Sequence, residues 1–265
     1  MHELLACALP GLAVSAALAL MAWAWSLRLR DVSIVDPFWP FMVAGAGLAH
    51  AVCLPTHGAR GALALGLAWA WALRLGLHLA GRRRGHGEDR RYQAIRARNQ
   101  PGFAVKSIYL VFGLQALLAW CVSVPLGVAA ASTAPLNALD LAGAALTLFG
   151  LLFEAVADVQ LARFRARRTR QAAQVMDQGL WRYSRHPNHF GEACVWWGLG
   201  VVAFAGGGPG ALWSLASPVL MTVLLLKVSG VGLLEADMLD RNEAYRAYIA
   251  RTPAFVPGRP RKDTG

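Results

Sequence analysis

Two acidic side chains, Glu154 and Asp158, stand four residues apart in an apolar stretch of the sequence. In a helix this spacing places both on one face. Two carboxylates on one face in or near a membrane are unfavourable unless something binds them or one is protonated. One interpretation is that they accept hydrogen bonds from hydroxyls or an amide of a ligand inside a helix bundle. The other is that they pair with the arginines that begin at Arg163, one turn further on.

The densest group of residues capable of chemistry is the stretch 177–192, which reads DQGLWRYSRHPNHFGE. Gly179 permits a turn, and Pro187 suits the first turn of a helix. Exposed amides at a helix start, together with arginines, make an anion site suited to a diphosphate. We therefore predict an anion-binding helix entrance, and the alternative is an aromatic and basic belt at the membrane interface. The side chains at this entrance are Arg182, Tyr183, Arg185, His186 and Asn188.

Polar residues also occur in apolar surroundings earlier in the chain. Asp36 is flanked by aliphatic and aromatic residues and followed by Pro37. We predict either that it donates a proton to a substrate or that it caps a helix that starts there. Trp71, Arg74 and His78 follow one another at helical spacing. Arg74 either extends its long side chain to the interface or binds an anion.

The elements that must hold these residues are membrane-spanning helices. The 265 residues are 56% hydrophobic and 15% charged, whereas a soluble domain usually carries about a quarter charged residues. The apolar residues gather into blocks long enough to cross a bilayer, which takes about 20 residues per helix. We predict an all-α polytopic bundle of about seven transmembrane helices that forms a single membrane domain. The predicted spans are 4–26, 35–54, 61–80, 107–130, 138–161, 190–206 and 211–234.

The basic residues mark one side of this bundle. Arginines cluster after the first span, between the third and fourth, between the fifth and sixth, and after the seventh, while the alternate loops hold one arginine, Arg60. The positive-inside rule then places the N-terminus outside and the C-terminus in the cytoplasm of a bacterial inner membrane. The first three residues carry no Lys or Arg, so we interpret the first block as an uncleaved span. Arginines that flank spans contact membrane lipids, and we expect no nucleic acid partner.

The cysteines and the C-terminal tail carry weaker signals. Cys7, Cys53, Cys121 and Cys194 sit singly, without metal-ligand spacing. We predict no metal site and no disulfide framework. The tail is predicted to form an amphipathic helix, on which Tyr245 and its neighbour Tyr248 either pack against the bundle or close over a ligand.

Four segments together resemble a known family. They are SIVD at 33–36, EDRRY at 88–92, GLWRYSRHPNHFGE at 179–192, and a Tyr-x-x-Tyr-x-x-x-Thr-x-x-Phe-x-Pro pattern from Tyr245. The chain is similar to the bacterial DUF1295 proteins, which belong to the steroid 5-alpha-reductase-like membrane reductases. The resemblance implies a seven-helix bundle and an NADPH-dependent reduction of a carbon–carbon double bond conjugated to a ketone.

The resemblance also implies roles for individual residues. Asn188 would contact the nicotinamide amide, with Glu192 supporting it one turn along. Arg165 falls near an arginine that binds the cofactor phosphates, and Glu154 and Asp158 occupy the places of a polar pair that holds the cofactor. The predicted cofactor-binding residues are Arg74, Glu154, Asp158, Arg165, Arg182, Tyr183, Arg185, His186, Asn188, Glu192 and Tyr245.

The catalytic residues that the resemblance implies are Asp36 and Trp71. Asp36 lies close to the catalytic glutamate of the family. Trp71 falls where the steroid reductases have a tyrosine, although an indole only donates and cannot relay a proton. NADPH would bind in the half of the chain from about 138 to 257. Its hydride would pass to a lipophilic, steroid-like or isoprenoid-like substrate that enters from the lipid. The substrate would lie in the half from about 1 to 130.

Two other classes of protein share parts of this pattern. Membrane methyltransferases of the isoprenylcysteine or phospholipid type have an Arg-His-Pro loop before a span and bind S-adenosylmethionine there. Asn188, Glu192 and the acidic pair favour NADPH over that cofactor. A non-enzymatic lipid-binding or transport protein is the third class, but charged residues on one side fit a one-sided site better than a path through the membrane.

Overall fold

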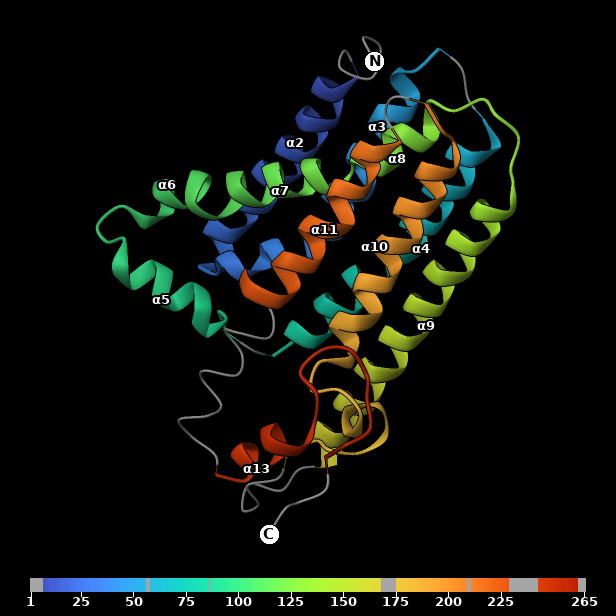
Figure 1. The fold of residues 1–265 in the computed structure, drawn as a ribbon. Coiled ribbons are helices and arrows are strands. Elements are labelled where there is room, and N and C mark those ends of the chain that lie inside the picture. The colour runs from blue at the N-terminus through green and yellow to red at the C-terminus, as the bar shows by residue number, and fades with distance from the viewer. Residues whose placement is uncertain are drawn as a thin grey trace. The chain divides into compact units, whose positions relative to one another are not determined.

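The computed structural model of the protein describes residues 7–55, 58–85, 87–167, 175–208, 211–228 and 243–261. All regular elements in these ranges are helical (Figure 1). They are the helices α2 (Ala8–Leu29), η1 (Val32–Ile34), α3 (Val35–Cys53), α4 (Ala59–Arg83), α5 (Arg90–Arg98), α6 (Phe103–Ser107), η2 (Ile108–Gly113), α7 (Leu114–Val122), α8 (Val124–Ala130), α9 (Ala138–Arg167), η3 (Gly179–Arg182), α10 (Pro187–Ala205), η4 (Leu212–Leu215), α11 (Ala216–Val223), η5 (Leu224–Val228) and α13 (Glu243–Arg251).

Several of these helices have the length and composition of membrane spans. Five helical runs in the described ranges are long and apolar enough to cross a bilayer: Ala8–Leu29, Val32–Cys53, Ala59–Arg83, Phe103–Ala130 and Ala138–Arg167. This confirms the prediction of an all-helical, multi-pass membrane protein. The sixth predicted block is α10, which has 19 residues. The seventh is helical over Leu212–Lys227, and its end, 229–234, lies outside the described residues, as does the start of the predicted tail up to residue 242. The count of seven spans stays a prediction.

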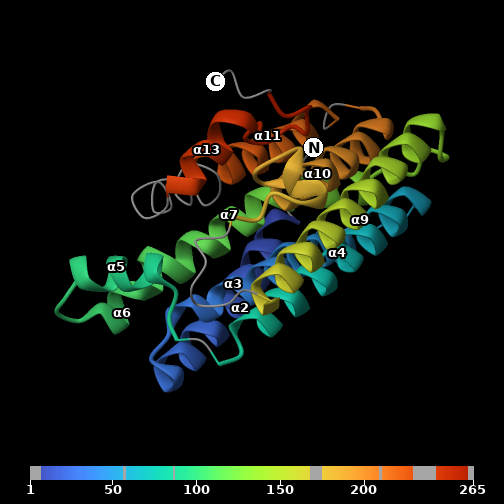
Figure 2. The ribbon, with the colours of Figure 1, turned by 90° about the horizontal axis from the view of Figure 1, so that it is seen from below.

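The chain divides into two compact units. The first unit comprises Met1–Ala144 and Leu199–Ser217, and the second comprises Ala145–Gly198 and Pro218–Gly265. In the first unit, α3 packs against α2 and α4, and also against α7 and α8. Figure 2 shows the same ribbon from below, with α2, α3 and α4 side by side.

Small residues allow the helices of the first unit to approach closely. A Cβ atom on Gly61 of α4 would lie 2.7 Å from the Cα atom of Ala130 in α8, and a Cβ atom on Gly76 of α4 would lie 2.4 Å from the ring of Phe41 in α3. Glycines at such contacts are typical of membrane helix pairs, because close backbone approach supplies the packing energy that lipid cannot.

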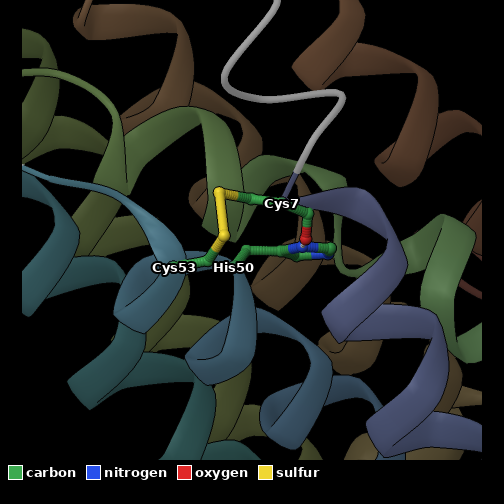
Figure 3. The surroundings of a disulfide bond; sticks show 3 residues. All are labelled: Cys7, His50 and Cys53. Atoms are coloured by element: carbon green, nitrogen blue, oxygen red, sulfur yellow. Dashed lines mark hydrogen bonds between the residues drawn. A yellow bond between two sulfur atoms is a disulfide. The ribbon is translucent and has the colours of Figure 1, made fainter.

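The amino-terminal end of α2 is joined to the carboxyl-terminal end of α3 by a disulfide between Cys7 and Cys53 (Figure 3). The prediction of no disulfide was wrong in this respect. The two cysteines are 46 residues apart in sequence, and their Cα atoms come within 5.5 Å because α2 and α3 run antiparallel. His50, one turn before Cys53, lies with its Nδ1 atom 2.8 Å from the Cys7 carbonyl oxygen.

Replacing Cys7 with alanine is expected to lower the free energy of unfolding by about 2–4 kcal/mol, since a cross-link over a loop of this length restricts the unfolded chain. Thermal unfolding in detergent under non-reducing conditions measures the change. Cys121, which is not cross-linked, provides the matched control, and Cys121→Ala should behave like the parent. Equal melting temperatures for Cys7→Ala and the parent would contradict the prediction.

The arginine in the alternate loops is fully buried. Arg60, at the start of α4, donates from Nε and Nη2 to the two carboxylate oxygens of Asp140 in α9, both at 2.8 Å. Its remaining hydrogen bonds go to the Ser132 hydroxyl at 2.6 Å and to the carbonyls of Ala134 at 3.3 Å and Pro135 at 2.9 Å. Because Arg60 is neutralised by a carboxylate, it does not act as a topology signal in the way that the solvated arginines do.

Candidate functional site

In the first unit, the chemistry-bearing residues gather around Asp36 in the first turn of α3. The Tyr92 hydroxyl donates to Asp36 Oδ1 at 2.6 Å, and Arg91 Nη2 donates to Asp36 Oδ2 at 3.3 Å. Arg91 Nε also donates to Asp89 Oδ1 at 3.0 Å, which ties the two carboxylates to one guanidinium. We call Asp36, Asp89, Arg91 and Tyr92 the Asp36 cluster.

A second set of contacts fastens the loop before α5 to the turn before α3. Glu88 accepts hydrogen bonds from the backbone amide of Val32 at 2.9 Å and from Arg96 Nη2 at 2.7 Å. Asp31 accepts from the Ser33 amide at 2.9 Å and from the Arg83 guanidinium. Asp31 therefore caps the turn, and Asp36 is left to bind Tyr92 and Arg91 instead of capping a helix.

The charges around Tyr92 hold its proton in place. Burial raises the pKa of the Tyr92 phenol well above its usual value, and the neighbouring Asp36 carboxylate raises this pKa further. Burial alone would raise the pKa of Asp89, but hydrogen bonds from the Arg91 side chain and backbone amide outweigh it, so the pKa of Asp89 is lowered. A protonated phenol thus donates to a carboxylate that an arginine also holds, so Tyr92, Asp36 and Arg91 form one hydrogen-bonded group.

Two tryptophans, Trp39 of α3 and Trp71 of α4, pack against each other. The Trp39 and Trp71 rings meet edge to face, with centroids 6.0 Å apart. Trp71 is fully buried, and Arg74 is partly buried one turn further along α4. The Trp39 indole nitrogen is buried and has no acceptor among the described residues. An indole donor without an acceptor is a position where a ligand oxygen can bind.

In the second unit, α9 and α10 cross where glycines remove side-chain bulk. A Cβ atom on Gly191 would lie 2.7 Å from the backbone nitrogen of Glu154, and a Cβ atom on Gly150 would lie 2.5 Å from the Gly191 carbonyl oxygen. This close crossing positions the acidic face of α9 against the first turns of α10.

The predicted acidic pair and the predicted asparagine meet at this crossing. Asn188 Nδ2 donates to Asp158 Oδ1 at 3.3 Å. Glu154, Asp158 and Glu192 are all buried, while Arg163 and Arg165 at the end of α9 are exposed. Because only the amide nitrogen of Asn188 can donate to a carboxylate, its Oδ1 atom is an acceptor, and this atom is buried with no donor among the residues that the structure describes. We call Glu154, Asp158, Asn188 and Glu192 the Asn188 cluster.

The loop before α10 is attached to both α9 and the C-terminal tail. The Leu180 amide donates to Gln160 Oε1 at 2.9 Å, and Trp181 Nε1 donates to the Ala157 carbonyl at 3.0 Å. Arg185 Nη1 donates to the tail carbonyls of Ile249 at 2.9 Å and Thr252 at 3.1 Å, and the prediction that Arg185 binds an anion stays a prediction. These contacts attach the loop to α9 and to the C-terminal tail.

Three other predicted cofactor residues differ in their surroundings. Arg182 and Tyr183 are exposed. Tyr245 is buried, and its ring packs against that of Tyr248 with centroids 5.8 Å apart. Of the two interpretations of the tail, the described contacts favour packing, because the Tyr248 hydroxyl donates to the Trp181 carbonyl.

His186 is buried at the entrance of α10 and stacks on His189, with ring centroids 5.4 Å apart. Burial, with a smaller effect from the adjacent Arg185, lowers the pKa of His186 from 6.5 to about 4. His186 is therefore neutral at physiological pH.

Stability should depend on pH through this histidine. Between pH 6.5 and pH 4, His186 is protonated in the unfolded state but stays neutral in the folded state. The free energy of unfolding is therefore unaffected by His186 above pH 6.5 and falls as the pH drops towards 4. The loss amounts to about 3 kcal/mol at 1.36 kcal/mol per pKa unit. The free energy of unfolding should be measured at pH 7.5 and pH 4.5 in the parent and in His186→Gln. The difference in this free energy between the two pH values should be smaller in His186→Gln by this amount. The same change in the free energy of unfolding between pH 7.5 and pH 4.5 in both proteins would contradict this prediction.

Comparison with known proteins agrees with the segments quoted above. A model of a family of unknown function, DUF1295, matches residues 22–252. The chain belongs to the DUF1295 family. No curated protein and no solved structure matches the chain. The matched range of this DUF1295 protein contains both the Asp36 cluster and the Asn188 cluster.

Within this DUF1295 protein, the predicted residues fall into different units. Asp36, Trp71 and Arg74 belong to the first unit, and the remaining predicted cofactor residues belong to the second. Sequence reasoning missed Tyr92 and Arg91 as the partners of Asp36, and Trp39 as a buried donor. The EDRRY segment was the available signal, but a charged run beside a span also fits a solvated loop.

Proposed function

We propose that this DUF1295 protein is a membrane-embedded, NAD(P)H-dependent reductase of a carbon–carbon double bond in a lipophilic substrate. The observation that carries the proposal is the contact between Asn188 and Asp158, beside the buried carboxylates Glu154 and Glu192. Buried carboxylates in a membrane helix pair need a functional reason. The family match and the multi-pass helical fold are compatible with the proposal.

The Asn188 cluster has the donors and acceptors that a nicotinamide and its ribose require. A carboxamide offers two N–H donors and a carbonyl, and the buried Asn188 Oδ1 atom is an acceptor with no donor among the described residues. Carboxylates accept hydrogen bonds from ribose hydroxyls. When bound, NADPH would supply a hydride to the β-carbon of an activated alkene.

The Asp36 cluster supplies the proton that this reaction also consumes. The Tyr92 phenol keeps its proton and lies 2.6 Å from Asp36, and Arg91 holds the carboxylate in place. In our proposal, the Tyr92 hydroxyl donates to the developing enolate oxygen and transfers its proton to it, and the phenolate that remains is reprotonated from water. Asp36 and Arg91 position the Tyr92 hydroxyl for this step. The buried Trp39 N–H is an additional donor for a substrate oxygen, beside Trp71, the tryptophan that the resemblance implies.

Our proposal includes the orientation predicted from charge, with the N-terminus outside and the C-terminus in the cytoplasm. The Cys7–Cys53 disulfide supports it, because disulfides persist in oxidising compartments and not in the cytoplasm. This bond lies at the end of α2 and α3 opposite to Arg28, Arg30 and Arg83. The cofactor would then be taken from the cytoplasm, and the lipophilic substrate from the bilayer.

Cofactor binding by full-length protein in mild detergent tests the proposal. A bound ligand raises the melting temperature by mass action, so NADPH, NADH and S-adenosylmethionine should be compared at equal concentration. We expect stabilisation by NADPH, and we expect Asn188→Ala and Glu154→Ala each to weaken NADPH binding at least tenfold. Gln93→Ala, an exposed residue of α5, is the control.

Each alternative has a distinct outcome in the same experiment. Stabilisation by S-adenosylmethionine alone would replace the reductase with a methyltransferase. No stabilisation by any of the three would favour a lipid-binding or transport protein. NADPH binding that is unchanged in both Asn188→Ala and Glu154→Ala would reject the Asn188 cluster as the cofactor site.

A further inference from the structure

A pocket of about 410 Å³ opens between the loop before α10 and the C-terminal tail of the second unit. This volume is near the lower end of the range for ligand pockets, about 300–1,000 Å³. We call it the tail pocket, and its lining residues are Asp177, Gln178, Arg182, Arg251, Thr252, Pro260 and Arg261. None of these residues belongs to the Asn188 cluster.

The charge of the tail pocket is strongly positive. Three of its residues are arginines and one is an aspartate. Arg251 pairs with Asp177 at 2.5 Å, which leaves Arg182 and Arg261. Within the described ranges neither of these two side chains has an ion-pair partner. Arg182 and Arg261 are exposed, and two such guanidinium groups lining one hollow create a positive potential that attracts an anion.

The backbone around the tail pocket holds these groups in place. The Arg261 amide donates to the Arg251 carbonyl at 2.8 Å and so closes the tail into a loop. The Gly258 amide donates to the Tyr183 carbonyl at 2.9 Å, and the Ser184 hydroxyl donates to the Phe255 carbonyl at 2.7 Å. Because these bonds join the tail to the loop that carries Arg182, the two arginines face the same hollow without a further folding step.

We propose that the tail pocket binds a phosphate group that carries two negative charges. Arginine is the side chain best matched to phosphate, because its planar fork donates two parallel hydrogen bonds. Thr252 and Gln178 line the same pocket, and both side chains carry neutral hydrogen-bond donors. The lining residues lie outside the five apolar spans, so a water-soluble phosphate or phosphate ester reaches them from the aqueous side. An anionic lipid headgroup offers the same chemistry, and the test separates the two sources.

The test uses full-length protein in non-ionic detergent and isothermal titration with inorganic phosphate and pyrophosphate at constant ionic strength. We expect saturable binding that weakens at least tenfold in Arg182→Gln and in Arg261→Gln. Arg259→Gln is the matched control, since Arg259 is exposed, lies two residues from Arg261 and does not line the pocket. It removes the same charge and should change binding less than twofold. Arg182→Lys keeps the charge without the fork and should bind with intermediate affinity.

A second arm replaces the soluble anions with vesicles of phosphatidylcholine, with or without phosphatidic acid. Stabilisation by phosphatidic acid that is lost in Arg261→Gln but kept in Arg259→Gln, without binding of soluble phosphate, would assign the pocket to a lipid headgroup. Equal loss in all three arginine variants, or no binding in either arm, overturns the proposal. Without ligand, all variants should first show the parent's melting temperature. If Arg261→Gln does not fold, the binding measurements on Arg182→Lys decide the proposal. The cofactor experiment varies Asn188 and Glu154, whereas this test varies Arg182 and Arg261 and uses anions without a nicotinamide, so the two proposals can fail separately.

Discussion

Replacing Tyr92 with phenylalanine should lower the turnover of the reductase about 10²- to 10⁴-fold, the usual contribution of a positioned proton donor. The variant keeps the ring and its burial but loses the hydroxyl that donates to Asp36 at 2.6 Å. Asp36→Asn should cause a loss of similar size, because the amide removes the charge that Arg91 holds. The substrate for this assay is the lipophilic molecule that co-purifies with the protein, identified by mass spectrometry, and NADPH oxidation reports the rate.

The control for this experiment is Tyr109→Phe, because Tyr109 is exposed on η2 and lies outside the Asp36 cluster. Its turnover should match that of the parent. Affinity for NADPH should be unchanged in Tyr92→Phe, since the proposed cofactor site is the Asn188 cluster. The double variant Asp36→Asn with Tyr92→Phe should lose little more than either single variant, because residues that act as a unit are not additive. Full turnover in Tyr92→Phe would remove the phenol from the mechanism.

Replacing Asp140 with asparagine should lower the free energy of unfolding by about 3–5 kcal/mol, because a buried guanidinium is left without its carboxylate. Arg60 is fully buried and donates two hydrogen bonds of 2.8 Å to Asp140. Unfolding of the protein in mixed micelles by increasing denaturing detergent measures the change.

The pair can also be removed as a whole. In Arg60→Met with Asp140→Leu, no charge remains buried, and such replacements of buried pairs are often neutral or better. The double variant should therefore recover at least half of the stability that Asp140→Asn loses. If Asp140→Asn unfolds within about 1 kcal/mol of the parent, below the usual effect of a buried unpaired charge, water must reach Arg60 and the pair is not a structural requirement.

Much of the architecture follows from local sequence. Each run of about 20 apolar residues predicts a helix that crosses the bilayer, because in lipid the backbone must satisfy its own hydrogen bonds. The first five predicted blocks are helices of the required length and composition. Likewise, the four-residue spacing of Glu154 and Asp158 places them on one face of α9, and Pro187 begins α10 as predicted. These are properties of single helices, which periodicity and composition describe.

The contacts that make up the two clusters depend on packing between segments far apart in the chain. Tyr92 and Asp36 are 56 residues apart, and Asn188 and Asp158 are 30 residues apart. Cys7 and Cys53 looked isolated because a disulfide depends on how close the two Cα atoms come and how the Cβ atoms point in the folded chain, which no sequence spacing reveals. Register between helices is set where backbones approach most closely, as at Gly150 and Gly191. A sequence pattern repeats along one helix and carries no information on which residue of a neighbouring helix it will face, so these pairings appear only in the folded chain.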